Sequence, residues 1–255
     1  MTWMHTATST HPFDDLQVSP SPDVAPLARA AEALLHAVKP LHTLDALKGT
    51  PAVVRVVGSP GSGRTLLARR VAQCLRPVNR ATLHEINVIR RIAGLAELEA
   101  PVSPDEAPRA FPHPKQQWIP LRAPHFTVSA IGMFGSGVYP GEIHLAHGGL
   151  LLLDEVHELQ APIQAKLVDL MQRQAQNPTA EPTQHTRGTP GWAFPARFTL
   201  ITLENPCGCG NLNNTARECV CTTGGVLVHR ARNLIAEAFP DAPVIDLDVM
   251  RRVAA

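Results

Sequence analysis

The sequence predicts an α/β fold with a mainly parallel sheet, and two patterns lead to that expectation. Three short apolar runs have the composition of buried strands, at residues 52–57, 149–153 and 198–203. Before and between them, apolar residues recur at helical spacing over residues 25–39, 66–75, 83–94 and 162–176. Strands that alternate with helices pair in parallel and are covered by helices. We therefore expect a three-layer sandwich, with helices on both faces of the sheet.

The length of 255 residues suits one sizeable domain with additional segments at its ends. Residues 1–24 are rich in Ser, Thr and Pro and are expected to be flexible. The core domain is expected over residues 25–222, followed by a short C-terminal segment over residues 223–255. The formal net charge is +1, so the chain has no overall basic field of the kind that attracts nucleic acid.

Composition also indicates where the protein works. No apolar run approaches the roughly 20 residues that a membrane-spanning helix needs. The N-terminus lacks the basic and apolar regions of a signal peptide. The chain has 5 cysteines, and their crowding late in the sequence is unlike a secreted disulfide scaffold. We therefore expect a protein of the reducing cytoplasm, without a membrane partner.

A glycine-rich segment, GSPGSGRT, lies between the first expected strand and a helix. Its pattern, G-x-x-x-x-G-x-[ST], is that of a phosphate-binding loop in the strand–loop–helix context that such a loop needs. Backbone N–H groups of the loop and the helix N-terminus bind the phosphate oxygens. Thr65 is expected to place its hydroxyl on Mg²⁺. Taken alone, the segment also fits a glycine-rich turn without a ligand. The predicted nucleotide-binding residues are Gly58, Ser59, Pro60, Gly61, Ser62, Gly63, Arg64, Thr65 and Leu66.

One position of this loop departs from the usual pattern, because Arg64 stands where the consensus has lysine. Lysine is a compact point charge, whereas arginine is planar and prefers to grip an anion with two nitrogens. The positive charge is kept, so nucleotide binding is expected to survive. A small misplacement of the γ-phosphate costs a large factor in rate, so hydrolysis is expected to be impaired.

Two acids close the second expected strand, in the segment LLLLDE. Asp154 would hold Mg²⁺, directly or through water, and Glu155 would act as the general base on the attacking water. Parallel strands carry their ligands at their carboxyl ends, where the glycine-rich loop also falls. Asn205, which follows the third strand, is a candidate to orient that water, although a loop asparagine is also a common turn residue.

Four cysteines form two close pairs, Cys207–Cys209 and Cys219–Cys221. Four soft ligands in two pairs suit a closed, tetrahedral, structural Zn²⁺ site, which we predict over residues 207–221. The C-x-C spacing leaves unligated thiols or a redox pair as the alternative. The histidines show no ligand spacing, and His157, which follows the acids, is expected at the surface.

Three longer segments carry a resemblance to a known family. The segments PLRAPHFTVSAIGMFGSGVYPGEIHLAHGGLLLLDEVHEL (residues 120–159), FPARFTLITLENPCGCG (residues 194–210) and HEINVIRRIAGL (residues 84–95) look like the magnesium-chelatase-I-like ATPases, in particular the ComM-like group. The resemblance covers about two-thirds of the chain, from Val53 to Cys221.

The resemblance implies an AAA+ P-loop fold, ATP and Mg²⁺ as cofactors, and assembly into rings. It implies ATP binding for residues 58–65, Mg²⁺ binding for Asp154, catalysis for Glu155 and sensing of the nucleotide for Asn205. ComM-like members are motors on branched DNA, and chelatase members drive Mg²⁺ insertion into a porphyrin, so DNA or protein is an expected substrate. The family's C-terminal lid and its arginines have no clear match after Cys221, so the lid is expected to be missing.

Two functions remain open from the sequence. The first is an ATP-binding AAA+ core that hydrolyses ATP slowly or only with a partner subunit, as the retained Glu155 favours. The second is a pseudo-ATPase, an interaction module that binds nucleotide without turnover, as Arg64 and the expected loss of the lid favour.

Overall fold

A computed structural model describes residues 24–41, 51–75, 78–99, 119–176, 194–214 and 216–252. The segment 1–24, predicted to be flexible, lies outside these ranges except for its last residue. Part of the predicted loop after residue 95 also lies outside them. Among the described residues, no helix is long and apolar enough to cross a membrane.

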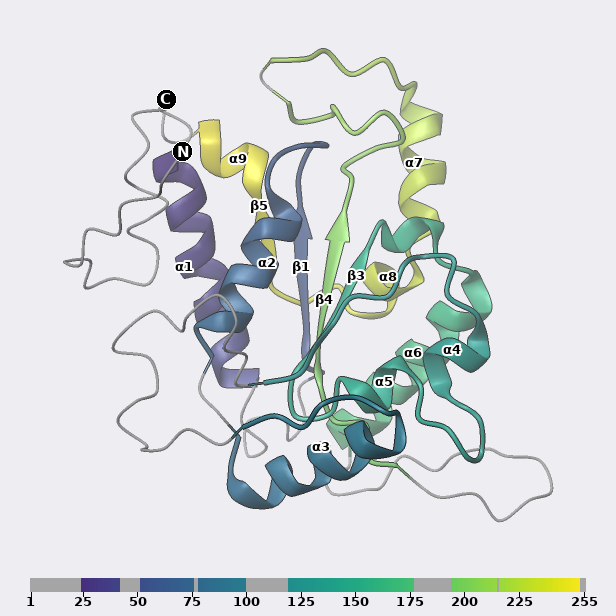
Figure 1. Cartoon of the computed structure of the whole chain (residues 1–255). Coiled ribbons are helices and arrows are strands. Elements are labelled where there is room, and N and C mark those ends of the chain that lie inside the picture. The colour runs from purple at the N-terminus through teal and green to yellow at the C-terminus, as the bar shows by residue number, and fades with distance from the viewer. Residues whose placement is uncertain are drawn as a thin grey trace, which may run out of the picture.

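Five parallel strands form one sheet in the order β2-β3-β4-β1-β5 (Figure 1). In chain order they are β1 (Val53–Val57), β2 (Leu121–Arg122), β3 (Leu150–Asp154), β4 (Thr199–Glu204) and β5 (Val244–Asp246). The three central strands are almost entirely buried, as expected for parallel strands covered on both faces. The register pairs Val57 with Glu204 and Asp154 with Leu203, so the three central strands end together.

Helices cover both faces of this sheet (Figure 1). The helical segments are α1 (Val24–Leu41), α2 (Arg64–Gln73), α3 (Arg80–Ile92), α4 (Ala130–Phe134), α5 (Glu142–Leu145), η3 (Val156–Glu158), α6 (Ala161–Gln176), α7 (Thr223–Ala231), α8 (Leu234–Ala238) and α9 (Leu247–Arg252). Helices α1 and α2 pack on one face of the sheet, where Leu247 of α9 joins them. Helices α4, α5, α6 and α8 pack on the other face.

Side-chain alternation along the strands builds the two apolar layers. On β3, Leu150 and Leu152 pack toward α1 and α2, whereas Leu151 and Leu153 pack toward α6. This alternation follows from the period of two in a strand, which sends successive side chains to opposite faces. The predicted three-layer sandwich is therefore confirmed.

The elements predicted from apolar patterns are present, with ends that differ by up to three residues. The edge strands β2 and β5 and the short helices were not predicted. Strand β5 pairs with β1, and Ile245 and Leu247 enter the same apolar layer as α1. The segment 223–255 was expected to lie outside the core, but its described residues 223–252 supply one edge of the sheet.

Leu152 offers a test of this core, because its side chain is only 1% exposed between the sheet and its helix layer. We expect Leu152→Ala to lower the free energy of unfolding by about 2–5 kcal/mol, from lost burial and the cavity left behind. Urea unfolding followed by circular dichroism measures this. The control is Ile131→Ala, whose side chain is 70% exposed and which should change stability by less than about 0.5 kcal/mol. Equal losses in the two variants would contradict the assigned core.

Candidate nucleotide site

The turn after β1 has the backbone geometry that its glycines were expected to permit. Gly61 and Gly63 have positive φ angles of 79° and 91°, which residues with a side chain rarely adopt. The N–H of Ser62 donates to the carbonyl of Ser59 at 3.0 Å, and α2 begins at Arg64 directly after Gly63. The first N–H groups of this helix form a site suited to an anion.

Asp154 lies beside this turn, although it is 89 positions from Thr65 in the sequence. The Thr65 hydroxyl donates a hydrogen bond of 2.9 Å to Oδ2 of Asp154. The other carboxylate oxygen of Asp154 accepts from the backbone N–H of Glu155 at 3.0 Å. The two predicted Mg²⁺ ligands are thus in direct contact at the carboxyl end of the sheet.

Glu155 has the only positive φ angle of a non-glycine residue in the described ranges, at 51°. This left-handed conformation is costly for a residue with a side chain, and such strain concentrates at functional sites. It lets the chain turn sharply out of β3 into η3. The second acid therefore leaves the line of the strand directly after Asp154.

Arg64 is buried, with 9% of its surface exposed. Its Nη1 has no hydrogen-bond partner among the described residues. Burial lowers the pKa of this guanidinium, and the nearby acids, led by Asp154 and Glu155, act in the opposite direction. An arginine stays protonated in proteins. The turn therefore holds a buried cation with an unused donor, which an anionic ligand would satisfy.

A buried carboxylate, which no sequence pattern predicted, holds the first part of the turn. Asp248 of α9 is 3% exposed, and its Oδ2 accepts from both the N–H of Ser59 at 2.7 Å and the Ser59 hydroxyl at 2.6 Å. The start of the turn is thereby tied to the last described helix. No sequence motif links residues 189 positions apart, so only the structure could identify this contact.

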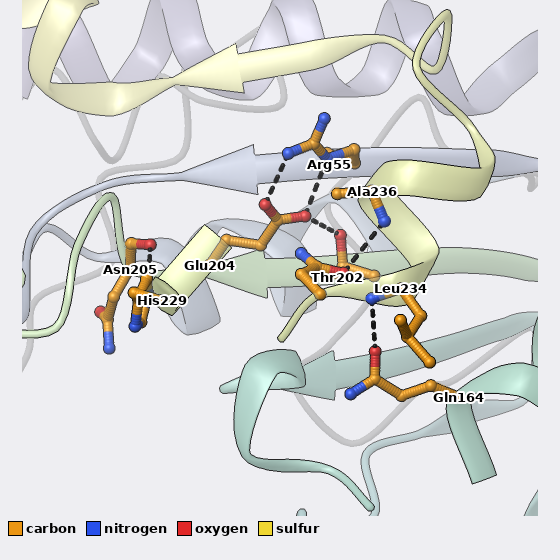
Figure 2. A network of polar contacts seen from close by, with 9 residues as sticks. Arg55, Gln164, Thr202, Glu204, Asn205, His229, Leu234 and Ala236 are labelled. Atoms are coloured by element: carbon orange, nitrogen blue, oxygen red, sulfur yellow. Dashed lines mark hydrogen bonds and ion pairs between the residues drawn. The ribbon is translucent and has the colours of Figure 1, made fainter. Parts of the chain in front are cut away.

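The end of β4 carries a second unpredicted carboxylate, Glu204, which is 6% exposed (Figure 2). Arg55 of β1 donates to it through Nε and Nη2, at 2.9 and 2.8 Å, and the Thr202 hydroxyl donates at 2.7 Å. These bonds raise the pKa of Arg55, chiefly through the side-chain hydrogen bond to Glu204. The carbonyl of Glu204 accepts from the N–H of Gly58 at 3.1 Å, so β4 also supports the turn. Arg55 is the only charged residue within β1, a signal that could have pointed to a buried acid nearby.

Asn205 follows Glu204 and therefore lies at the carboxyl end of β4, next to the strand that carries Asp154. Its carbonyl oxygen lies 3.1 Å from Nε2 of His229, the contact drawn in Figure 2. Its side-chain oxygen is buried and has no partner among the described residues. Asn205 thus keeps an unused acceptor, which a bound water or ligand donor could use.

Two histidines near these elements are buried. His157 is 8% exposed, which corrects the expectation of a surface residue, and its ring lies 4.2 Å from that of His229. Burial lowers the pKa of His157 to about 4, with a smaller contribution from His229. His144, at 2% exposed, has its pKa lowered to about 4, also mainly by burial. Its Nδ1 accepts from the N–H of Gly141 at 3.0 Å.

The four clustered cysteines meet, as predicted for a metal site. Their sulfur atoms all lie within 4.8 Å of one another, the one such cluster of potential ligands in the described part of the chain. Sγ of Cys207 lies 3.4 Å from that of Cys209 and 3.6 Å from that of Cys219. Four sulfurs placed about 2.3 Å from a central zinc would be about 3.8 Å apart. The cluster is therefore close to the size of a tetrahedral site.

A parallel sheet in this strand order, with a glycine-bearing turn after β1 and an acid pair after β3, defines a P-loop NTPase domain of the AAA+ type. The model of the family described as "Magnesium chelatase, subunit ChlI" matches residues 46–253. The chain belongs to this family, as its sequence resemblance predicted.

Relatives in this family are considerably longer than this chain. The competence protein ComM of Haemophilus influenzae is 30% identical over 195 residues, which cover 76% of this chain and 33% of that protein. The uncharacterized protein YifB of Salmonella typhimurium is 29% identical over 174 residues, which cover 64% of this chain and 29% of that protein. The chain thus spans about a third of the length of these relatives.

Among solved structures, NtrX from Brucella abortus in complex with ATP matches with a TM-score of 0.46 and 15% sequence identity. The match covers 90% of this chain and 38% of that one.

The two buried histidines predict a pH dependence of stability. The fold lowers the pKa of both histidines from 6.5 to about 4. Between pH 4 and pH 6.5 the unfolded chain therefore binds more protons than the folded chain does. Their neutral forms stabilise the fold fully above pH 6.5, and this stability is lost as the pH falls toward 4. We expect a smaller free energy of unfolding at pH 5.5 than at pH 7.5, measured by urea unfolding.

The matched variants are His144→Asn, which keeps an acceptor for the N–H of Gly141, and His84→Asn, at an exposed position of α3. His144→Asn should show a smaller loss of stability on acidification than the wild type, and His84→Asn an unchanged one. An equal loss in all three proteins would contradict a role for the buried imidazoles.

Proposed function

We propose that this chain is an ATP-binding AAA+ core domain of the magnesium-chelatase-like, ComM-like type, in which hydrolysis is slow or depends on a partner subunit. The observation that carries the proposal is the direct contact between Thr65 and Asp154 at the mouth of the glycine turn. In P-loop NTPases the hydroxyl of the phosphate loop and an acid at the end of a neighbouring strand hold Mg²⁺ together. Thr65 and Asp154 would take these two roles here.

The residues fit Mg·ATP on independent grounds. The unused, buried Nη1 of Arg64 calls for an anion at the N-terminus of α2. The N–H groups at the N-terminus of α2 supply further donors, as phosphate loops generally do. Oxygen ligands such as the Thr65 hydroxyl and the Asp154 carboxylate are those that Mg²⁺ prefers.

Each residue then has a distinct task in hydrolysis. Bound Mg²⁺ would neutralise charge on the phosphates, and Thr65 and Asp154 would hold it there. Glu155 would accept a proton from the attacking water, and the free side-chain oxygen of Asn205 would orient that water. Arg64 would hold the terminal phosphates by its charge, with the planar guanidinium in place of an ammonium group.

The slow rate follows from that substitution. A guanidinium is bulkier than an ammonium and cannot occupy the same point beside the γ-phosphate, and small errors of position cost large factors in rate. The same observation favours the second candidate function, a pseudo-ATPase that binds nucleotide and contacts partners without turnover. Ring assembly and a DNA or protein substrate are further proposals, which rest on the family resemblance alone.

Three proteins separate the two functions: the wild type, Glu155→Gln and Arg64→Lys. For a slow ATPase we expect low steady-state phosphate release, lost by about 10²-fold or more in Glu155→Gln, since the general base is removed. Arg64→Lys should raise the rate about tenfold, because it restores the usual point charge. All three should bind Mg·ATP with dissociation constants below millimolar, measured by calorimetry.

Tight Mg·ATP binding without turnover in any of the three would favour the pseudo-ATPase. Absence of Mg·ATP and Mg·ADP binding at millimolar ligand in folded protein would remove both functions. Asp169→Asn, an exposed change on α6, is the control and should leave binding and turnover unaltered.

We also propose that the cysteine cluster over residues 207–221 binds one structural Zn²⁺. The support is the mutual approach of four sulfurs to within 4.8 Å, from two segments separated by a loop. All four ligand positions are filled by the chain, so the ion would have a structural role and no open coordination site.

The metal proposal predicts one zinc per chain by elemental analysis of protein purified without chelators. The double variant Cys207→Ser, Cys219→Ser should lose the zinc, since it loses two thiolate ligands. Cys74→Ser, which changes a buried cysteine on the helix after the glycine turn, should keep it. Folded wild-type protein that contains no zinc and takes up none would refute the site.

A further inference from the structure

The segment that carries the four cysteines, residues 207–221, packs closely against the turn of the nucleotide site, residues 58–63, at Gly210. A Cβ atom placed on Gly210 would lie 2.4 Å from Cδ and 2.6 Å from Cγ of Pro60. Real Cβ atoms do not approach other atoms so closely, so only glycine permits this packing. In Figure 1 the loop after β4 and the turn between β1 and α2 lie at the same end of the sheet.

On its own side of the contact, Gly210 is fixed by the cysteine cluster. It follows Cys209 directly, and its N–H donates to the carbonyl of Cys207 at 2.9 Å. Its φ angle of 78° closes the turn that brings Cys207 and Cys209 to the same centre. Cys207 is fully buried, so this end of the loop is anchored in the protein. A change in the arrangement of the sulfurs therefore moves Gly210.

On the other side, Pro60 stands in the middle of the nucleotide turn. Asp248 holds Ser59 before it through two hydrogen bonds, and the N–H of Ser62 bonds back to the carbonyl of Ser59. The proline ring fixes its own φ angle, which limits how the residue can adjust to a shift of Gly210. A displacement of Pro60 therefore shifts the residues that follow it, up to the N-terminus of α2, where the phosphates are proposed to bind.

We propose that metal binding at the four cysteines sets the conformation of the nucleotide turn through the contact of Gly210 with Pro60, so that zinc and nucleotide bind cooperatively. This inference rests on the proposed ATP and zinc sites. Because coupling between two sites is reciprocal, zinc raises the affinity for Mg·ATP by the same factor by which Mg·ATP raises the affinity for zinc. Couplings of this kind typically amount to about 5- to 150-fold.

The first experiment measures Mg·ATP affinity by calorimetry for the zinc-loaded and zinc-depleted full chain. We expect depletion to weaken Mg·ATP binding about tenfold in the wild type. Gly210→Ala should keep one zinc per chain, bind Mg·ATP about as weakly as the depleted wild type, and respond little to depletion. Gly94→Ala, at a φ of 70° with nothing within 4 Å of the new Cβ, is the matched control and should behave as the wild type does.

A second variant separates the contact from general damage to the loop. Pro60→Ala removes the ring atoms that Gly210 touches, so Mg·ATP affinity should no longer depend on zinc. Added to Gly210→Ala, it should recover part of the lost Mg·ATP affinity, because the clash is relieved. A purely structural role of Gly210 would show no such recovery. The second variant also keeps the test open should Gly210→Ala fail to fold.

The reciprocal experiment follows zinc release to a colorimetric chelator. Release from the wild type should slow several-fold when Mg·ADP is present, and release from Pro60→Ala should not. Equal Mg·ATP affinity of zinc-loaded and zinc-depleted wild type would overturn the coupling while leaving both sites in place. Failure of the wild type to bind Mg·ATP, or to bind zinc, would instead refute the corresponding site and the coupling with it.

Discussion

The hydrogen bond from Thr65 to Asp154 is the contact on which the candidate site depends, because it joins two chain segments that lie 89 positions apart in the sequence. Its geometry is a product of the sheet. Strands β1, β4 and β3 lie side by side in parallel, so the turn after β1 and the acids after β3 emerge at one edge. The apolar side chains that bury both faces of these strands therefore position the polar chemistry as well.

Around this contact, the buried carboxylates of the site each accept a small number of short hydrogen bonds. Glu204 is satisfied by both nitrogens of one edge of Arg55 and by Thr202. Charge-assisted, two-point bonds of this kind orient a side chain more firmly than single neutral ones. Arg64 and Asn205, in contrast, retain unpaired atoms in the described part of the structure. Glu204 thus has its hydrogen bonds within the protein, whereas Arg64 and Asn205 keep atoms that a ligand could use.

The parts that could be predicted from sequence are those encoded by contiguous residues. The central strands were found to within one residue, because burial on both faces leaves an uninterrupted apolar run. The edge strands, β2 with two residues and β5 with three, are too short to show a pattern. The glycine turn, the acid pair and the cysteine pairs each form a local motif. Asp248, the partner of Ser59, lies 189 positions away, and Glu204, the partner of Arg55, lies 149 positions away. No local sequence pattern could predict these contacts.

The bond between Asp248 and Ser59 has a consequence for how the turn meets its ligand. The N–H and the hydroxyl of Ser59 both donate to the buried carboxylate of Asp248. An anion can therefore accept hydrogen bonds from Ser59 only if α9 moves away. The anion-binding capacity of the turn is thus confined to its later half, toward α2. A ligand must present its negative charge at that end, which selects the tip of a polyphosphate chain over a bulkier anion spread across the whole turn.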